Sequence, residues 1–206
     1  MSVPNNPDNS GFTLIEVSIA SLILISALLG VGLLITKMTL GASTSKDMSS
    51  AAVLLSEKIE DLNRWDVDDP HICVPAGHAN AGSLTADITQ TTTCSQGASA
   101  SISYDDDVYP NLTDGSNVCP DPSAGCFAET VSSMVGGNPV YTTTVHSPNG
   151  ILQTTSSSSP PTGATFHRRW IIEADSPITG VRRVTVTISN PTATPPVSFQ
   201  MTAVRP

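Results

Sequence analysis

The chain has 206 residues, of which 4% are aromatic and 13% charged, and its formal net charge is -9. This length is enough for one domain with an extension. The acidic balance argues against a protein that binds nucleic acid through a general basic surface, because neutralising phosphates requires clustered Lys and Arg. A solvated exterior surface carries the same kind of charge, so the composition by itself points to no ligand.

An apolar run occupies residues 12–35 and contains a single charged residue, Glu16. As a helix this run would be ~36 Å long, which exceeds the ~30 Å hydrocarbon core of a bilayer. A cleaved secretory signal would need a basic n-region, a shorter apolar core and an A-x-A-like site, and the sequence offers none of them. A plain membrane anchor explains the length of the run but not Glu16, because a carboxylate is costly in lipid.

The string "GFTLIEVSIA", which begins at Gly11, resembles the type III signal of the type IV pilin family. Its parts are a short polar leader (residues 1–11) that ends in Gly, then Phe, then an apolar run with Glu at the fifth position after the Gly. The resemblance implies that a prepilin peptidase cleaves between Gly11 and Phe12 and that the new amine of Phe12 is N-methylated. It also implies a single-pass protein of the bacterial inner membrane, with its head in the periplasm and later in a pilus at the cell surface.

Glu16 takes an assembly role in this interpretation. In a filament core that excludes water, its carboxylate would pair with the Phe12 amine of a neighbouring subunit, which offsets desolvation and favours one axial register. A carboxylate tolerated near the membrane edge is the alternative. The leader "MSVPNNPDNS" has no Lys or Arg, so the expected orientation rests on the motif and not on the positive-inside rule.

The helix is expected to run from Phe12 to Trp65, with residues 36–66 as its amphipathic continuation. The string "DVDDP" at 66–70 is expected to end it, with Pro70 as the stop. Apolar residues recur at steps of four and three, which predicts a buried stripe of Met48, Ala52, Leu55, Ile59 and Leu62. Five charged residues near the end of this segment are expected on the opposite side of the helix: Glu57, Lys58, Glu60, Asp61 and Arg64. A coiled-coil stalk is the alternative, but the stripe lasts about two heptads and not the three or four that a coiled coil requires.

The four cysteines are Cys73, Cys94, Cys119 and Cys126, with no CxxC pair and no histidine at zinc-finger spacing. An even number of cysteines beyond a membrane segment indicates a disulfide framework in an oxidising compartment. Of the three possible connectivities we favour the sequence-local one, Cys73–Cys94 with Cys119–Cys126, because "CPDPSAGC" suits a tight turn. Free buried thiols are the alternative.

Residues 67–206 are expected to form a globular extracytoplasmic head. Before residue 160, the best strand candidates are residues 100–104 and 140–146, surrounded by long polar loops, and "QTTSSSSPPTG" is typical of an exposed linker. Within about residues 165–204, three alternating segments joined by turns predict an antiparallel meander.

The register of that meander follows from its apolar residues. Pairing Ile172 with Val184 and Trp170 with Val186 places the apolar faces together and sets Glu173 opposite Arg183 on the outer face. The apolar face of the meander then matches the stripe on the helix. The sequence therefore predicts an α+β fold, with a long helix laid against a small antiparallel sheet.

We expect no enzyme and no cofactor, because the chain has no GxSxG, HExxH or P-loop string and its histidines are scattered. Asp105, Asp107 and Asp114 in "YDDDVYPNLTDG" are candidate Ca²⁺ ligands, but their spacing is not that of an EF-hand and a solvated acidic loop is the preferred interpretation. The paired arginines at 168–169 and 182–183 fall on adjacent strands, where each pair splits between the two faces, so a DNA-binding patch is not favoured.

The helix stretch "AAVLLSEKIEDL", followed late by "RRWIIEAD" and "VRRVTVTISN", looks like minor pilins of the PilV type. The resemblance implies a role in pilus assembly or priming, with prepilin peptidase, other major and minor pilins, the inner-membrane assembly platform and membrane lipid as partners. Two alternatives remain. One is a minor pseudopilin of a type II secretion system, which shares the signal and the helix. The other is a surface adhesion or DNA-binding module on a pilin anchor, in which residues 71–160 contact a host surface or DNA.

Overall fold

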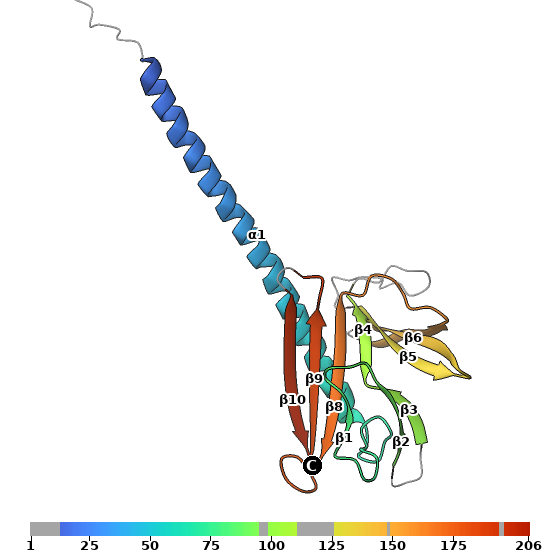
Figure 1. Ribbon diagram of the computed structural model, residues 1–206. Helices are drawn as coiled ribbons and strands as arrows, with labels where there is room; N and C mark the ends of the chain where they lie inside the picture. Colours follow the sequence, from blue (N-terminus) through green and yellow to red (C-terminus); the bar gives the residue numbers. More distant parts are fainter. Residues whose placement is uncertain (1–12, 95–98, 111–125, 148, 194–195) are drawn as a thin grey trace, which may run out of the picture. The chain divides into compact units, whose positions relative to one another are not determined.

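The computed structural model describes residues 13–94, 99–110, 126–147, 149–193 and 196–206 (Figure 1). One helix, α1 (Leu14–Arg64), precedes all of the described strands. The chain divides into two compact units, Met1–Ser43 and Thr44–Pro206, and α1 contributes residues to both. Gly11 and Phe12, between which cleavage is expected, lie outside the described residues.

The first part of α1 is apolar on every side. All of its large apolar side chains from Leu14 to Leu40 are between 45% and 86% exposed. Its hydroxyl groups donate hydrogen bonds of 2.8–3.0 Å to carbonyls four residues earlier, in Ser18, Ser21, Ser26, Thr36 and Thr39. These hydroxyls are therefore satisfied without water. In the part of the chain that the structure describes, α1 is the one helix long and apolar enough to cross a membrane.

The second unit contains an eight-stranded antiparallel sheet in the order β10-β9-β8-β4-β5-β6-β7, with β1 also paired to β8. The strands are β1 (Asn80–Gly82), β4 (Asp105–Tyr109), β5 (Phe127–Val135), β6 (Asn138–Ser147), β7 (Gly150–Ser157), β8 (Phe166–Ala174), β9 (Arg182–Asn190) and β10 (Val197–Arg205). A separate two-stranded sheet is formed by β2 (Thr89–Thr93) and β3 (Ser99–Ser103). The α+β class is therefore confirmed.

The predicted meander is β8, β9 and β10, and its register is as expected. Ile172 lies opposite Val184 and Trp170 opposite Val186. Glu173 lies opposite Arg183, and the guanidinium Nε donates to a Glu173 carboxylate oxygen at 2.6 Å. The register is well specified because a one-residue slip would move the whole apolar set to the solvated face.

The expectation of a small sheet with long polar loops before residue 160 was wrong. Strands β4 to β7 widen the sheet on one side of β8, and residues 153–157 of the expected linker belong to β7. These strands are rich in Thr and Ser, which suit a pleated surface without forming a strong apolar pattern. Thr130 and Thr143, for example, are buried opposite each other with hydroxyl oxygens 2.8 Å apart.

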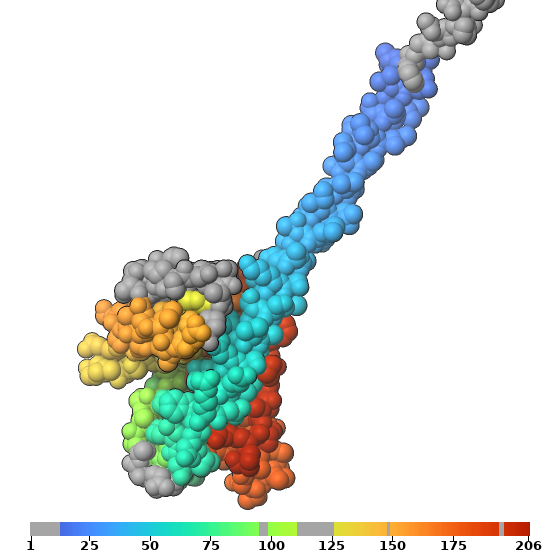
Figure 2. All heavy atoms as spheres, turned by 180° about the vertical axis from the view of Figure 1, so that it is seen from behind, coloured from blue at the N-terminus to red at the C-terminus, as the bar shows by residue number. Residues whose placement is uncertain are grey.

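The last part of α1 packs on one face of β8, β9 and β10; it lies behind these strands in Figure 1 and is seen from the other side in Figure 2. The buried helix residues are Ala51, Leu54, Leu55, Lys58, Ile59 and Leu62. Met48 and Ala52 of the predicted stripe are exposed, because the sequence "AAVLL" also offers Ala51 and Leu54 on a neighbouring stripe. The placement of Lys58 on the opposite side of the helix was wrong, and the reason is electrostatic.

The disulfide between Cys73 and Cys94 is present, with an S–S distance of 1.94 Å, and confirms the first predicted pair. It connects the segment that follows α1 to the end of β2. Cys126 is disulfide-bonded as well. Cys119 lies outside the described residues, so the pairing Cys119–Cys126 stays a prediction.

Among the glycines that the structure describes, Gly82 is the one at which a side chain would do most harm. Its φ is +88°, and an added Cβ would lie 2.3 Å from the Trp170 carbonyl oxygen and 2.7 Å from Tyr104 Cδ1. We expect Gly82→Ala to lower the free energy of unfolding by about 2–4 kcal/mol, since a left-handed backbone and overpacking both act. Urea unfolding of the detergent-solubilised chain, followed by tryptophan fluorescence, measures this change.

Gly77 supplies the matched control for Gly82. Its φ is +83°, but nothing lies within 4 Å of an added Cβ. Gly77→Ala should therefore show the backbone effect alone, about 1–2 kcal/mol. Equal losses in the two variants would contradict the proposed clash with Trp170 and Tyr104.

Candidate functional site

The N-terminal end of α1 carries the residues that the sequence singled out. The hydroxyl of Thr13 accepts a hydrogen bond from the Glu16 N–H at 3.3 Å, and the Thr13 carbonyl accepts the N–H groups of Glu16 and Val17 at 3.0 and 3.2 Å. The sequence Thr-x-x-Glu at 13–16 is the pattern of a capping box, in which Gln can replace Glu. Glu16 also lies in the first turn, where a negative charge interacts favourably with the helix dipole. Helix initiation is thus a second role for Glu16, which the string "TLIE" could have indicated.

Glu16 has no counter-charge in the apolar first part of its helix. From Thr13 to Thr36 it is the one charged residue of the sequence. Together with Val17, Ala20, Ser21 and Leu24 it lines a shallow groove on the helix surface. The small side chains of Ala20 and Ser21, one turn away, leave room beside the carboxylate. In a medium that excludes water, this charge needs a partner from outside residues 13–36.

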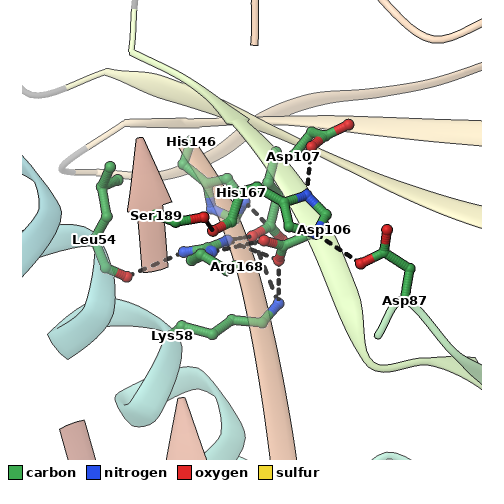
Figure 3. Close-up of polar contacts among 10 residues, drawn as sticks. Leu54, Lys58, Asp87, Asp106, Asp107, His146, His167, Arg168 and Ser189 are labelled. Carbon is green, nitrogen blue, oxygen red and sulfur yellow. Dashed lines mark hydrogen bonds and ion pairs between the residues drawn. The ribbon is translucent and has the colours of Figure 1, made fainter. Parts of the chain in front are cut away.

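A second group of charges lies buried between α1 and the sheet (Figure 3). Arg168 of β8 makes a two-fold contact with Asp106 of β4, at 2.7 Å from Nε and 2.8 Å from Nη2. Lys58 of α1 lies 2.9 Å from Asp106 and 3.6 Å from Glu129 of β5, and its ammonium is 4.4 Å from the ring centroid of Trp170. Lys58, Asp106 and Arg168 are all at least nine-tenths buried. We call Lys58, Asp106, Glu129 and Arg168 the buried charge cluster.

The buried charge cluster connects α1 to β4, β5 and β8, and His146 extends it to β6. Arg168 also bonds Glu129 at 2.5 Å and donates from Nη1 to the Leu54 carbonyl of the helix at 3.0 Å. Glu129 in turn lies 3.3 Å from Nε2 of His146 on β6. Every charge of the cluster faces an opposite charge, and these contacts fix the helix on the sheet.

The electrostatics of the cluster follow from its geometry. Burial alone raises the pKa of Glu129, but the charge of Lys58, the imidazole of His146 and the charge of Arg168 outweigh burial and hold this pKa well below its usual value. Burial lowers the pKa of Lys58, and the charges of Asp106 and Glu129 more than reverse the effect. Glu129 and Lys58 are therefore charged at neutral pH.

The acidic stretch that was expected to be a solvated loop is strand β4, in the middle of the sheet. Asp106 is 1% exposed, whereas Asp105 and Asp107 point to the opposite, outer face of the sheet. Asp114, the third calcium candidate, lies outside the described residues. Burial, helped by the charge of Asp87, raises the pKa of Asp105 to about 6. The calcium hypothesis for these residues stays untested.

The paired arginines divide between the faces of the sheet. Arg168 points to the helix, while Arg169 points outward and donates to Asp87 at 2.6 Å. Arg182 donates to the Val67 carbonyl, and Arg183 is paired with Glu173. The sequence indicated this division, since neighbours on a strand point oppositely.

Comparisons with known proteins found no match to a family model, to a curated protein or to a solved structure. The helix with Glu16, the buried charge cluster and the outer face of the sheet are therefore the features from which a function has to be argued.

Proposed function

We propose that this chain is a minor pilin of a type IV pilus system, a non-enzymatic subunit that acts in pilus assembly or priming. The observation that carries the proposal is the sequence string "GFTLIE" together with the helix that begins at Leu14, whose apolar side chains are exposed on every side as far as Ile35. A helix of this kind needs lipid or the core of a filament around it, because so much apolar surface is unfavourable in water.

The amphipathic part of α1 supports the same proposal. A filament subunit has to transmit the position of its packed helix to its head, which requires the helix and the head to be joined firmly. Three apolar side chains of the predicted stripe, Leu55, Ile59 and Leu62, are buried against the sheet. The buried charge cluster adds directional contacts to this packing, since charged hydrogen bonds specify a geometry that apolar contacts leave open.

The proposal includes the partners that the resemblance implies. Prepilin peptidase would cut on the cytoplasmic side of the inner membrane, and the assembly platform and other pilins would then take up the mature chain with its head in the periplasm. Glu16 would meet the Phe12 amine of a neighbouring subunit in the filament core. A minor pseudopilin of a type II secretion system would use the same contacts, and co-purification with pilus or secretion components separates the two.

The surface-module alternative requires a correction. This alternative assumes that residues 71–160 form a separate insert that could be removed from the head. However, β1 and β4 lie in this range and both pair directly with β8. Deleting the range would remove strands from the middle of the sheet, so the deletion cannot separate binding from folding. Substitutions on exposed residues of β7, such as Ile151, are the suitable test of a binding surface.

Mass spectrometry of the purified chain tests the proposal. Co-expressed with a prepilin peptidase, the chain should begin at an N-methylated Phe12, and without the peptidase it should keep residues 1–11. Gly11→Ile is the matched control and should stay uncut, since a β-branched side chain would replace the small residue before the scissile bond. An N-terminus other than Phe12 in the presence of an active peptidase would contradict the pilin proposal.

A further inference from the structure

A histidine on the outer face of the sheet lies between two carboxylates (Figure 3). His167 of β8 has its Nδ1 2.7 Å from Asp107 Oδ1 and its Nε2 2.8 Å from Asp87 Oδ1. Asp105, two residues before Asp107 on β4, completes the group. One ligand atom from each of Asp87, Asp105 and His167 lies within 4.8 Å of the others. The helix and the buried charge cluster are on the other face of the sheet, so this group has no part in packing α1.

Both ring nitrogens of His167 contact a carboxylate oxygen. A neutral imidazole has one N–H, so it can donate to only one of the two carboxylates that it contacts. A carboxylate on Nδ1 is the usual partner of a metal-binding histidine, because it fixes the tautomer and directs the Nε2 lone pair at the metal. Asp107 is placed to do this. The contact between Nε2 and Asp87 then brings two electron-pair donors together, which is favourable only with a proton or a metal ion between them.

Negative charge around Nε2 is only partly compensated. Arg169 donates to Asp87, but both contacts to this residue are to Oδ1. Among the described residues, Oδ2 of Asp87 and both carboxylate oxygens of Asp105 have no hydrogen-bond or ion-pair partner. A half-buried carboxylate without a partner is unfavourable, and a bound cation would relieve it.

The backbone positions the residues of this group without a bound ion. On β4 and β8, Asp107 is directly opposite His167, and Asp105 is opposite Arg169. Asp87 follows a turn in which the Ser83 hydroxyl accepts the N–H groups of Thr85 and Ala86, both at 3.2 Å. Ligands on paired strands and a hydrogen-bonded turn need little ordering on binding, which favours affinity.

We propose that Asp87, Asp105 and His167 bind a divalent transition-metal ion, for which Zn²⁺ is the best match. His167 Nε2 and one oxygen from each carboxylate supply three ligands, water supplies the fourth, and Asp107 orients the imidazole from Nδ1. One imidazole with carboxylates suits Zn²⁺, whereas Ca²⁺ takes six to eight oxygen ligands. Binding displaces the proton of an imidazolium from Nε2 to solvent. The site is independent of the pilin proposal.

Zn²⁺ binding to the full chain in detergent tests the site, with a purification tag that contains no histidine. Competition with a chromogenic chelator at pH 7.5 should give one Zn²⁺ per chain. His167→Gln and Asp105→Asn should each weaken binding at least 100-fold, and Asp107→Asn, which acts through His167, about 10- to 100-fold. Asp105→Asn removes a carboxylate without a partner, so this variant stays informative if His167→Gln fails to fold.

Glu173→Gln is the matched control, because Glu173 lies on the same face of β8 but outside the group. Its affinity for Zn²⁺ should equal that of the parent chain. Absence of stoichiometric Zn²⁺ binding would overturn the proposal, as would binding that survives both His167→Gln and Asp105→Asn. Ca²⁺ binding that Asp105→Asn abolishes, without Zn²⁺ binding, would overturn the transition-metal assignment and restore the calcium hypothesis.

Discussion

Glu16→Leu is expected to leave membrane insertion intact and to reduce incorporation of the chain into filaments about 100-fold or more. Removing a carboxylate from an apolar run makes insertion easier, by an amount on the order of the 2.5–3.5 kcal/mol measured for Asp. Assembly would leave a neighbour's Phe12 amine buried without a partner, and an uncompensated buried charge costs about 3–5 kcal/mol. At about 1.4 kcal/mol per factor of ten, this cost corresponds to a loss of at least 100-fold.

Two further variants separate the charge of Glu16 from its place in the capping box. Gln also serves in a capping box, so Glu16→Gln keeps the helix start with Thr13 and removes the charge. If pairing with Phe12 matters, Glu16→Gln fails as Glu16→Leu does, and Thr13→Val, which keeps the carboxylate, assembles. The measurement is the amount of chain in sheared filaments relative to the membrane fraction. Normal incorporation of Glu16→Gln would remove the pairing role and leave helix initiation as the function of Glu16.

The parts of the fold that the sequence predicted share one property: their burial is driven by apolar side chains at a regular spacing. The helix and the register of β8 with β9 belong to this class, since Val184, Val186 and Ile188 alternate without interruption. Strands β4 to β7 do not belong to it. Their buried positions include Thr130 and Thr143, which pair with each other through their hydroxyls, and Asp106, whose burial depends on Lys58 and Arg168 far away in the sequence.

The candidate sites show the same division. The string around Gly11 and Glu16 is local, so one sequence was enough to find it. In the buried charge cluster, Asp106 contacts both Lys58 and Arg168. No local sequence pattern predicts contacts between residues so far apart in the chain. One signal was nevertheless present, because alternation along β8 puts Arg168 on the same face as Phe166 and Trp170. A charge on an apolar face implies a buried partner, and β4 offers one in Asp106, between Tyr104 and Val108.

Asp106→Ala should be the most destabilising single change in the head. It leaves Arg168 and Lys58 buried with Glu129 as the remaining carboxylate of the cluster, which corresponds to a loss of about 3–5 kcal/mol. Many domains have a total stability of about 5–15 kcal/mol, so this loss is a large fraction of the stability of the head. Urea unfolding monitored by Trp170 fluorescence measures the loss. Glu173→Ala, which breaks the exposed pair with Arg183, is the control and should change stability little.

Acid unfolding tests whether the charges of the buried charge cluster, and not only the packing of its side chains, stabilise the head. The folded-state pKa of Glu129 lies below its unfolded value of about 4.5, so the stability that Glu129 contributes is present above that pH and is lost as the pH falls through the folded pKa. A variant with Lys58→Met, Asp106→Leu, Glu129→Leu and Arg168→Met replaces the charges by apolar groups of similar size and should fold, since such exchanges are often neutral. Below about pH 4 it should lose less stability than the parent chain. If the two chains lose stability in parallel on acidification, the buried charges are not what holds α1 on the sheet.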